Sequence, residues 1–167
     1  RVGQTLADLR QYQPAERHLR RAAELAPHWA APQIELGLVL VQAGRDEQAR
    51  EVLARATALD PFNVRAANSL KLVNEVAGYT RTQSANFIIR SRPGLDARLA
   101  AEMLPVMEET FAAVTGTEPG ALDHAPPKPT FIDLMPDHAW FAVRIAGLPR
   151  IHTIAASTGP VIAMEAP

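Results

Sequence analysis

Residues 36–61 read "LGLVLVQAGRDEQAREVLARATALDP", and residues 2–27 read "VGQTLADLRQYQPAERHLRRAAELAP". The two stretches lie 34 positions apart and share landmark residues. The matched pairs are Gly3 with Gly37, Leu6 with Leu40, Ala15 with Ala49, Leu19 with Leu53, Ala22 with Ala56, and Pro27 with Pro61. Self-similarity at a fixed interval predicts a repeated structural unit of that length.

Each unit has the pattern of two antiparallel helices that pack on each other. Gly37 and Ala49 are small where two helices must approach closely, and Leu40 and Leu53 fill the space beside them. The apolar residues recur at helical spacing on both sides of Gly44, which predicts two amphipathic helices joined at that glycine. Asp46 is expected to be the N-cap of the second helix.

The spacing of these landmarks resembles the tetratricopeptide repeat (TPR) family, a helix–turn–helix unit of about 34 residues. A third copy begins at residue 64 but carries Asn74 at an apolar position and has no second helix, so we read residues 64–77 as a capping helix. The predicted fold of residues 1–80 is therefore an α-helical TPR solenoid of two repeats plus that helix. Because such arrays need several units, further repeats are expected upstream of Arg1.

In the TPR family the first helix of each pair lines a concave surface that binds a protein or peptide partner. The residues expected on this face are Ile34, Glu35, Leu38, Val41, Gln42, Arg65, Asn68, Ser69 and Leu72. Family members that bind a terminal carboxylate do so with clustered lysines and asparagines, and Arg65 and Asn68 are the only comparable residues here. The alternative is that the face is solvated or packs on the next domain.

The chain changes character after residue 80. Residues 91–167 contain ten prolines against four in residues 1–90, and β-branched runs replace the alanine-rich pattern. We expect a boundary at residues 79–86 and a partial α+β domain over residues 86–167. Its expected elements are a strand within 85–94, a helix from Leu95 to Gly116 broken or kinked at Pro105, a loop at 119–129, a strand at 129–136, a short helix opened by Asp137, and a hairpin formed by 151–157 and 160–167.

The runs "NFIIR", "PVMEETFAAVTG", "PTFIDLMPDHAWFA", "GLP" and "VIAMEAP" resemble the front part of bacterial peptidase MA-like domains, relatives of the thermolysin-type zinc enzymes. This likeness covers residues 86–167. In that family an H-E-x-x-H helix follows the strand that "VIAMEAP" would form, and its two histidines bind zinc. The chain contains no H-E-x-x-H, so the motif would lie beyond residue 167.

The resemblance implies that a zinc site is possible in the full-length protein, while this chain is expected to be a non-catalytic interaction or scaffold module. Two alternatives remain: the full-length protein is an active zinc metallopeptidase, or it is an assembly protein whose peptidase-like domain lost its metal. The resemblance also implies a periplasmic or extracytoplasmic location. The residues themselves do not indicate a location. Residues 160–165 are expected at a sheet edge, since the edge strand pairs with the substrate backbone in thermolysin-like domains.

The remaining composition excludes several sites within the chain. The net charge is −1 and cysteine is absent, which argues against a nucleic-acid surface and excludes thiolate metal sites. No apolar run is long enough for a membrane span, and no two histidines lie three or four positions apart. We therefore predict no catalytic residue, cofactor or metal in these 167 residues, with Glu108 and Glu109 solvated and Trp140 and Phe141 packed in the core.

Overall fold

A computed structural model describes residues 1–117, 120–153 and 155–166, and its N-terminal part consists of helices. Their bounds are α1 (Val2–Asp8), α2 (Tyr12–Leu25), α3 (Ala30–Gln42), α4 (Asp46–Leu59) and α5 (Val64–Val76). Each helix packs on the next one along the chain, so two pairs are followed by a fifth helix. This confirms the two helical pairs and the additional helix expected from the repeat.

The repeat landmarks fix how the helices of a pair approach each other. A Cβ atom added at Gly37 would lie 2.5 Å from Cδ2 of Leu53, and one added at Gly3 would lie 2.7 Å from Cγ of Leu19. These distances are shorter than real Cβ contacts, so only glycine fits at the two equivalent positions. The missing side chain of the first glycine in each unit therefore leaves the space that the leucine of the partner helix occupies.

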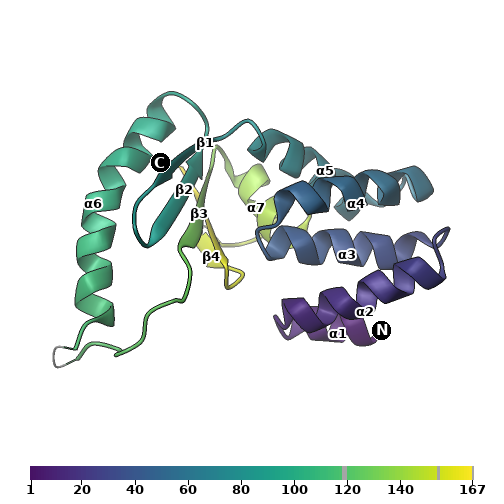
Figure 1. The fold of residues 1–167 in the computed structure, drawn as a ribbon. Helices are drawn as coiled ribbons and strands as arrows, with labels where there is room; N and C mark the ends of the chain where they lie inside the picture. Colours follow the sequence, from purple (N-terminus) through teal and green to yellow (C-terminus); the bar gives the residue numbers. More distant parts are fainter. Residues whose placement is uncertain (118–119, 154, 167) are drawn as a thin grey trace.

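The C-terminal part combines a mixed sheet with two helices. Its elements are β1 (Thr80–Gln83), β2 (Phe87–Ser91), α6 (Leu95–Thr115), β3 (Thr130–Met135), α7 (His138–Ala146), β4 (Ala155–Ser157) and β5 (Val161–Glu165). The strand order is β1-β2-β3-β5-β4, with parallel pairing between β2, β3 and β5 and an antiparallel strand at each edge. Figure 1 shows the sheet between α6 on one side and the repeat helices on the other.

The expectation that residues 160–165 form an edge strand is wrong. β5 lies between β3 and β4, and its inward side chains Val161 and Ala163 are buried. The edge is occupied by β4, the short first strand of the hairpin, whose Ala155 and Ser157 are exposed. The hairpin itself was expected, but its sequence does not reveal which of the two strands pairs with β3.

Two further differences from the expected structure concern strand β1 and helix α6. β1 occupies the stretch expected to be only a boundary, so the chain passes from α5 into the sheet within a few residues. α6 continues through Pro105 as one helix, without a second segment. Leu95, the first residue of this helix, is 81% exposed, whereas Ala100 and Leu104 form its buried contact. Parts of the expected loop and hairpin, namely residues 119, 154 and 167, lie outside the described residues.

The apolar core is divided by the sheet. Beneath α6 a small cluster joins Ala100 and Leu104 to Ile89, Ile132 and Leu134 of the strands. On the opposite face, one continuous cluster runs from the repeat helices into the sheet part and includes Met135, Phe141, Val143 and Ala163. Residues of both parts contribute to this larger core. The assignment of separate domains at 1–80 and 86–167 stays a prediction.

Candidate functional site

The face expected to bind a partner lies on α3 and α5, and α7 packs against it. Both α3 and α5 contact α7, which places a helix of the second half across the repeats. The expected surface residues have different exposures: Ile34, Leu38, Val41, Ser69 and Leu72 are buried, and Glu35, Gln42, Arg65 and Asn68 are half-buried.

The end of α7 fits closely against α5. The Nδ2 atom of Asn68 donates a hydrogen bond to the carbonyl oxygen of Gly147 at 3.2 Å. Gly147 ends α7 in the left-handed conformation, with φ of 71°, and a Cβ atom there would lie 3.3 Å from Cβ of Arg65. A void of about 10 Å³ lies between α7 and the residues around Leu38, Val41 and Ser69. Within the described residues, this part of the expected partner-binding face is filled by the chain itself.

This geometry corresponds to the alternative in which the face of α3 and α5 packs on the following part of the chain and does not bind a partner. Binding of a peptide by the same residues stays a prediction, and it would require α7 to leave the contact. Glu35 lies at the margin, with Oε1 at 4.0 Å from Nη1 of Arg65. Burial raises the pKa of the Glu35 carboxyl and Asp8 adds to the increase, while Arg65 opposes it.

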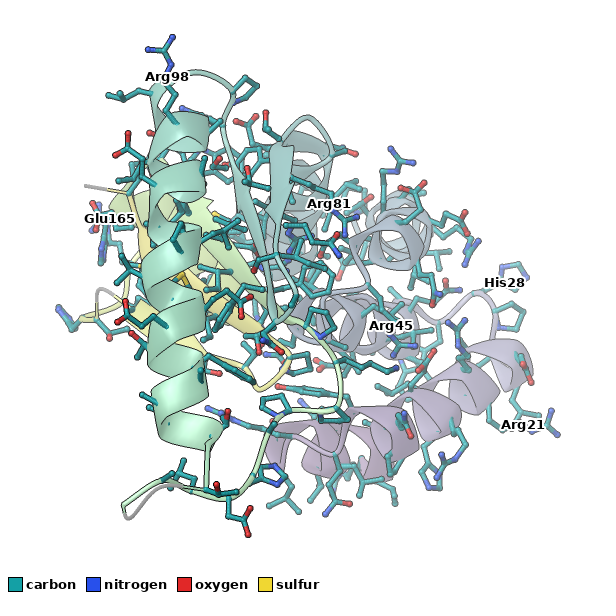
Figure 2. The ribbon with its side chains drawn as sticks, turned by 60° about the vertical axis from the view of Figure 1, so that its left-hand side comes forward. Arg21, His28, Arg45, Arg81, Arg98 and Glu165 are labelled. Atoms are coloured by element: carbon teal, nitrogen blue, oxygen red, sulfur yellow. The ribbon has the colours of Figure 1, made fainter. Side chains whose placement is uncertain are left out.

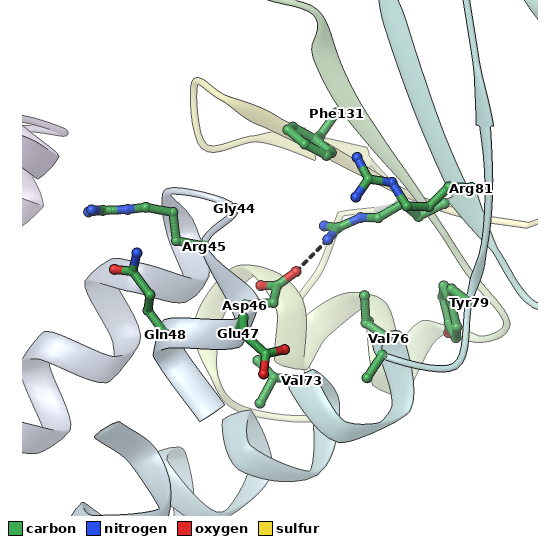
Figure 3. A pocket seen from close by; sticks show the side chains of 12 residues that line it. Gly44, Arg45, Asp46, Glu47, Gln48, Val73, Val76, Tyr79, Arg81 and Phe131 are labelled. Atoms are coloured by element: carbon green, nitrogen blue, oxygen red, sulfur yellow. Dashed lines mark hydrogen bonds and ion pairs between the residues drawn. The ribbon is translucent and has the colours of Figure 1, made fainter. Parts of the chain in front are cut away.

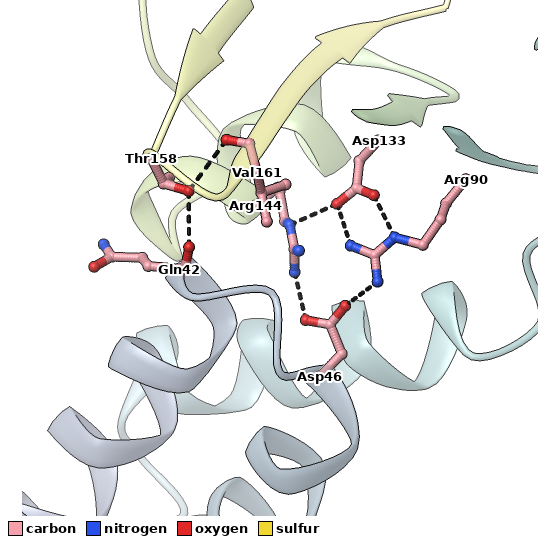
Figure 4. A network of polar contacts seen from close by, with 7 residues as sticks. All are labelled: Gln42, Asp46, Arg90, Asp133, Arg144, Thr158 and Val161. Carbon is pink, nitrogen blue, oxygen red and sulfur yellow. Dashed lines mark hydrogen bonds and ion pairs between the residues drawn. The ribbon is translucent and has the colours of Figure 1, made fainter. Parts of the chain in front are cut away.

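Four charged side chains join the repeats to the sheet (Figure 4). Asp133 on β3 accepts two hydrogen bonds from Arg90 on β2, from Nε at 2.5 Å and from Nη2 at 2.7 Å. Its Oδ2 atom also lies 2.8 Å from Nε of Arg144 on α7. Asp46 on α4 accepts from Arg144 Nη1 at 2.7 Å and from Nη1 of Arg90. We call Asp46, Arg90, Asp133 and Arg144 the junction network.

The junction network is withdrawn from water and electrically balanced. Asp133 and Arg144 are fully buried, Arg90 is 7% exposed, and two aspartates face two arginines. Burial alone raises the pKa of the Asp46 carboxyl, but the guanidinium groups of Arg144 and Arg90 together lower it below its ordinary value. Burial likewise lowers the pKa of Arg90, and Asp133 and Asp46 more than restore it. The carboxyl of Asp46 and the guanidinium group of Arg90 are therefore charged at neutral pH.

Sequence reasoning gave Asp46 the wrong role and missed the other three residues. The N-cap of α4 is Arg45, and Asp46 is the first helical residue, with its carboxylate directed at the two arginines. The signal for the network was present, since "FIIRS" and "FIDLM" each carry one charged residue inside a mainly apolar run. Neighbouring buried strands with opposite charges predict an ion pair, because an unpaired buried charge is costly.

The β4–β5 turn makes a second polar link to the repeats. Oγ1 of Thr158 donates to the carbonyl oxygen of Gln42 at 2.8 Å and also approaches the carbonyl of Val161 at 3.2 Å (Figure 4). The Tyr12 hydroxyl on α2 donates to the carbonyl oxygen of Thr158. Burial raises the pKa of Tyr12, so its hydroxyl keeps the proton for this bond at neutral pH.

The other candidates from the sequence have structural surroundings. Phe141 is fully buried in the larger core and Trp140 packs partly against it, in agreement with core packing. Glu108 was expected to be solvated, but its carboxylate accepts hydrogen bonds from Ser84 and from the backbone and side chain of Asn86. It thereby fixes the β1–β2 turn. In the described ranges, no group of three histidine or carboxylate side chains is placed to hold a metal.

His138 bridges two segments at the C-terminal end of β5. Its Nε2 atom lies 2.7 Å from the carbonyl oxygen of Ile151, and its Nδ1 atom lies 3.4 Å from Oε2 of Glu165. Both neighbours are acceptors, so only the doubly protonated ring donates to both. The carbonyl of Ile151 raises the pKa of His138, burial opposes the increase, and Glu165 and Asp137 add to it.

The raised pKa predicts a pH-dependent contribution to stability. Because protonation is favoured by folding, the contribution of His138 is complete below its unfolded pKa of about 6.5 and is lost as pH rises through the higher folded pKa. NMR titration of the ring should give a pKa above about 6.5, the ordinary value for histidine. His138→Gln should also flatten the loss of stability above pH 6.5. A His138 pKa at or below about 6.5 would contradict the bridge.

Comparison with protein families identifies the helical part: residues 6–72 match the family described as tetratricopeptide repeat. This part of the chain is a TPR region, and the match supports a protein-interaction module with protein partners. Neither the curated proteins nor the solved structures gave a match to the chain. In the part that the structure describes, no helix is both long and apolar enough to cross a membrane.

Proposed function

We propose that this chain is a TPR interaction or scaffold module fused to the front part of a peptidase MA-like domain. The H-E-x-x-H zinc motif of that domain would lie beyond residue 167, and the 167 residues themselves would be non-catalytic. The carrying observation is the sheet: parallel β2, β3 and β5 are flanked by an exposed antiparallel edge strand, β4. An edge strand has free backbone N–H and C=O groups that can pair with an extended substrate. In this proposal β4, and not β5, has that role.

The α6 side of the sheet also supports this proposal. α6 packs mainly on β1 and β2, while Ile162 and Met164 on β5 are only partly buried on the same side. A further helix after β5 would cover these apolar side chains, and a metal-binding helix is what the resemblance implies at that point. Zinc would then be supplied by residues outside this chain.

The proposal is tested on the longer protein. If the sequence after residue 167 encodes H-E-x-x-H, elemental analysis should find one zinc per chain, and an unstructured protein substrate such as casein should be cleaved. Replacing the glutamate of that motif by glutamine should abolish cleavage and retain zinc, as expected for a general base. Zinc without cleavage, or no motif at all, would favour the non-enzymatic assembly protein.

The interaction role is tested at Arg65, which lies half-buried at the margin of the concave face. Arg65→Glu places a negative charge beside Glu35 and the end of α7, so it should weaken binding of a concave-face partner about tenfold or more. Arg55→Glu makes the same charge change on the exposed side of α4 and is the matched control. Leu38→Asp, the other change suggested by the sequence, is unsuitable because Leu38 is buried.

The measurement is a pull-down with the wild type and both variants, checked by circular dichroism for equal helical content. Loss of partners with Arg65→Glu alone would support binding at this face. Retention of every partner would assign the face solely to the support of α7.

A further inference from the structure

A cavity of about 340 Å³ lies between the repeats and the sheet, apart from the concave face (Figure 3). The N-terminal turn of α4 forms one side, and β1 and β3 form the other. Ala77, which follows α5, and Phe131 of β3 contribute apolar surface, and the buried side chains of Val73 and Val76 on α5 lie beside them. Tyr79 also lines the cavity, and because burial raises its pKa to about 12 it remains a neutral phenol.

Most charges around the cavity already have partners. Arg45 pairs with Glu16, and Glu47 pairs with Arg50. Asp46 and Arg90 belong to the junction network, which is balanced. Arg81 differs from these groups: its side chain is exposed, and it forms no ion pair with any carboxylate of the described residues.

The sheet register places the positive charge of Arg81 opposite a second arginine. Arg81 on β1 is the direct antiparallel partner of Arg90 on β2. Both guanidinium groups lie over the ring of Phe131, at 5.6 Å for Arg81 and 5.1 Å for Arg90. Like charges opposite each other on a sheet are destabilising unless they are compensated. Arg90 is compensated by two aspartates, so Arg81 leaves one positive charge at the cavity wall.

We propose that this cavity binds a carboxylate carried on an apolar body, supplied by a protein partner. Arg81 pairs with the carboxylate in the forked geometry that guanidinium groups favour, while Phe131 holds the guanidinium plane. The apolar body packs on Ala77 and Phe131. The carboxylate is either the C-terminus of a partner or an acidic side chain within it. This site is independent of the peptidase-like assignment, and it lies outside the surface filled by α7.

The test uses three short peptides and the whole 167-residue chain. Acetyl-Ala-Ala-Leu carries a free terminal carboxylate, acetyl-Ala-Glu-Leu-amide carries one on a side chain, and acetyl-Ala-Ala-Leu-amide carries none. NMR titration should give saturable shifts of the Arg81 Nε–H and of the Tyr79 and Phe131 amides with a carboxylate peptide. The affinity of the uncharged peptide should be lower by a factor of about ten or more. This is the factor expected for the loss of one charge-assisted hydrogen bond.

Variants separate the site from general attraction to a positive surface. Arg81→Gln should weaken the carboxylate peptide about tenfold or more, whereas Arg98→Gln, on α6 away from Arg81 in Figure 2, should leave binding unchanged. Glu47→Gln removes a negative charge from the cavity wall and should tighten binding. Preference for either carboxylate peptide supports the proposal and identifies the source. Equal binding of the uncharged peptide, no saturable shift, or unchanged binding with Arg81→Gln would overturn it.

Discussion

Asp133→Asn is expected to lower the free energy of unfolding by about 3–5 kcal/mol, the usual cost of removing one partner from a buried ion pair. Asp133 is fully buried and faces both Arg90 and Arg144. The neutral amide would leave two buried guanidinium groups sharing the single carboxylate of Asp46. Urea denaturation followed by circular dichroism measures the change.

Asp123→Asn is the matched control, because Asp123 is exposed and asparagine tolerates its positive φ of 46°. It should change stability by less than about 0.5 kcal/mol. A double-mutant cycle sharpens the result: once Asp133 is neutral, Arg90→Gln should cost much less than it does alone. Additive costs, or an Asp133→Asn effect as small as the control, would show that the junction network does not couple these residues.

Leu53→Ala is expected to lower the free energy of unfolding by about 2–5 kcal/mol, and Leu40→Ala by a similar amount, as for other large-to-small core changes. Both leucines are fully buried. Leu25→Ala, at a position 70% exposed on α2, is the control and should cost less than about 1 kcal/mol. Changes within half a kcal/mol of wild type at both core sites would mean that the repeat stripe is not core.

The contact between Gly37 and Leu53 gives this prediction an internal check. Gly37→Ala alone should be destabilising, because its Cβ would lie 2.5 Å from the Leu53 side chain. In the Leu53→Ala background the same substitution should be tolerated, since the leucine side chain no longer occupies that space. It should even recover part of the loss through the helix propensity of alanine, worth about 0.5–1 kcal/mol. Equal effects in both backgrounds would contradict the close approach.

The helical half could be predicted from the sequence because its determinants are local and repeated. Gly37, Leu40 and Leu53 recur 34 residues after their counterparts, and the family match confirms the repeat. The hairpin of β4 and β5 and the N-cap at Asp137 were predictable for the same reason, since turns and caps depend on neighbouring residues. These features need no knowledge of distant contacts.

The rest depends on contacts between distant parts of the chain. Asp46 has an ordinary helix-start environment in sequence, and its ion pairs with Arg90 and Arg144 span 44 and 98 positions. The position of β5 inside the sheet likewise follows from pairing with β3, which no local pattern encodes. The concave face could be listed from the repeat, but its cover by α7 could not, because the repeat pattern says nothing about what packs on it.

We expect the TPR region and the sheet part to unfold as one cooperative unit, joined by α7 and the junction network. Hydrogen exchange of the peptides covering α3 and α7 tests it most directly, because protection measures the free energy of opening for each segment. We predict that the slowest amides of both helices share one opening free energy, and that Asp133→Asn lowers both by the same amount. Faster exchange of α7, with α3 unchanged by Asp133→Asn, would contradict the claim.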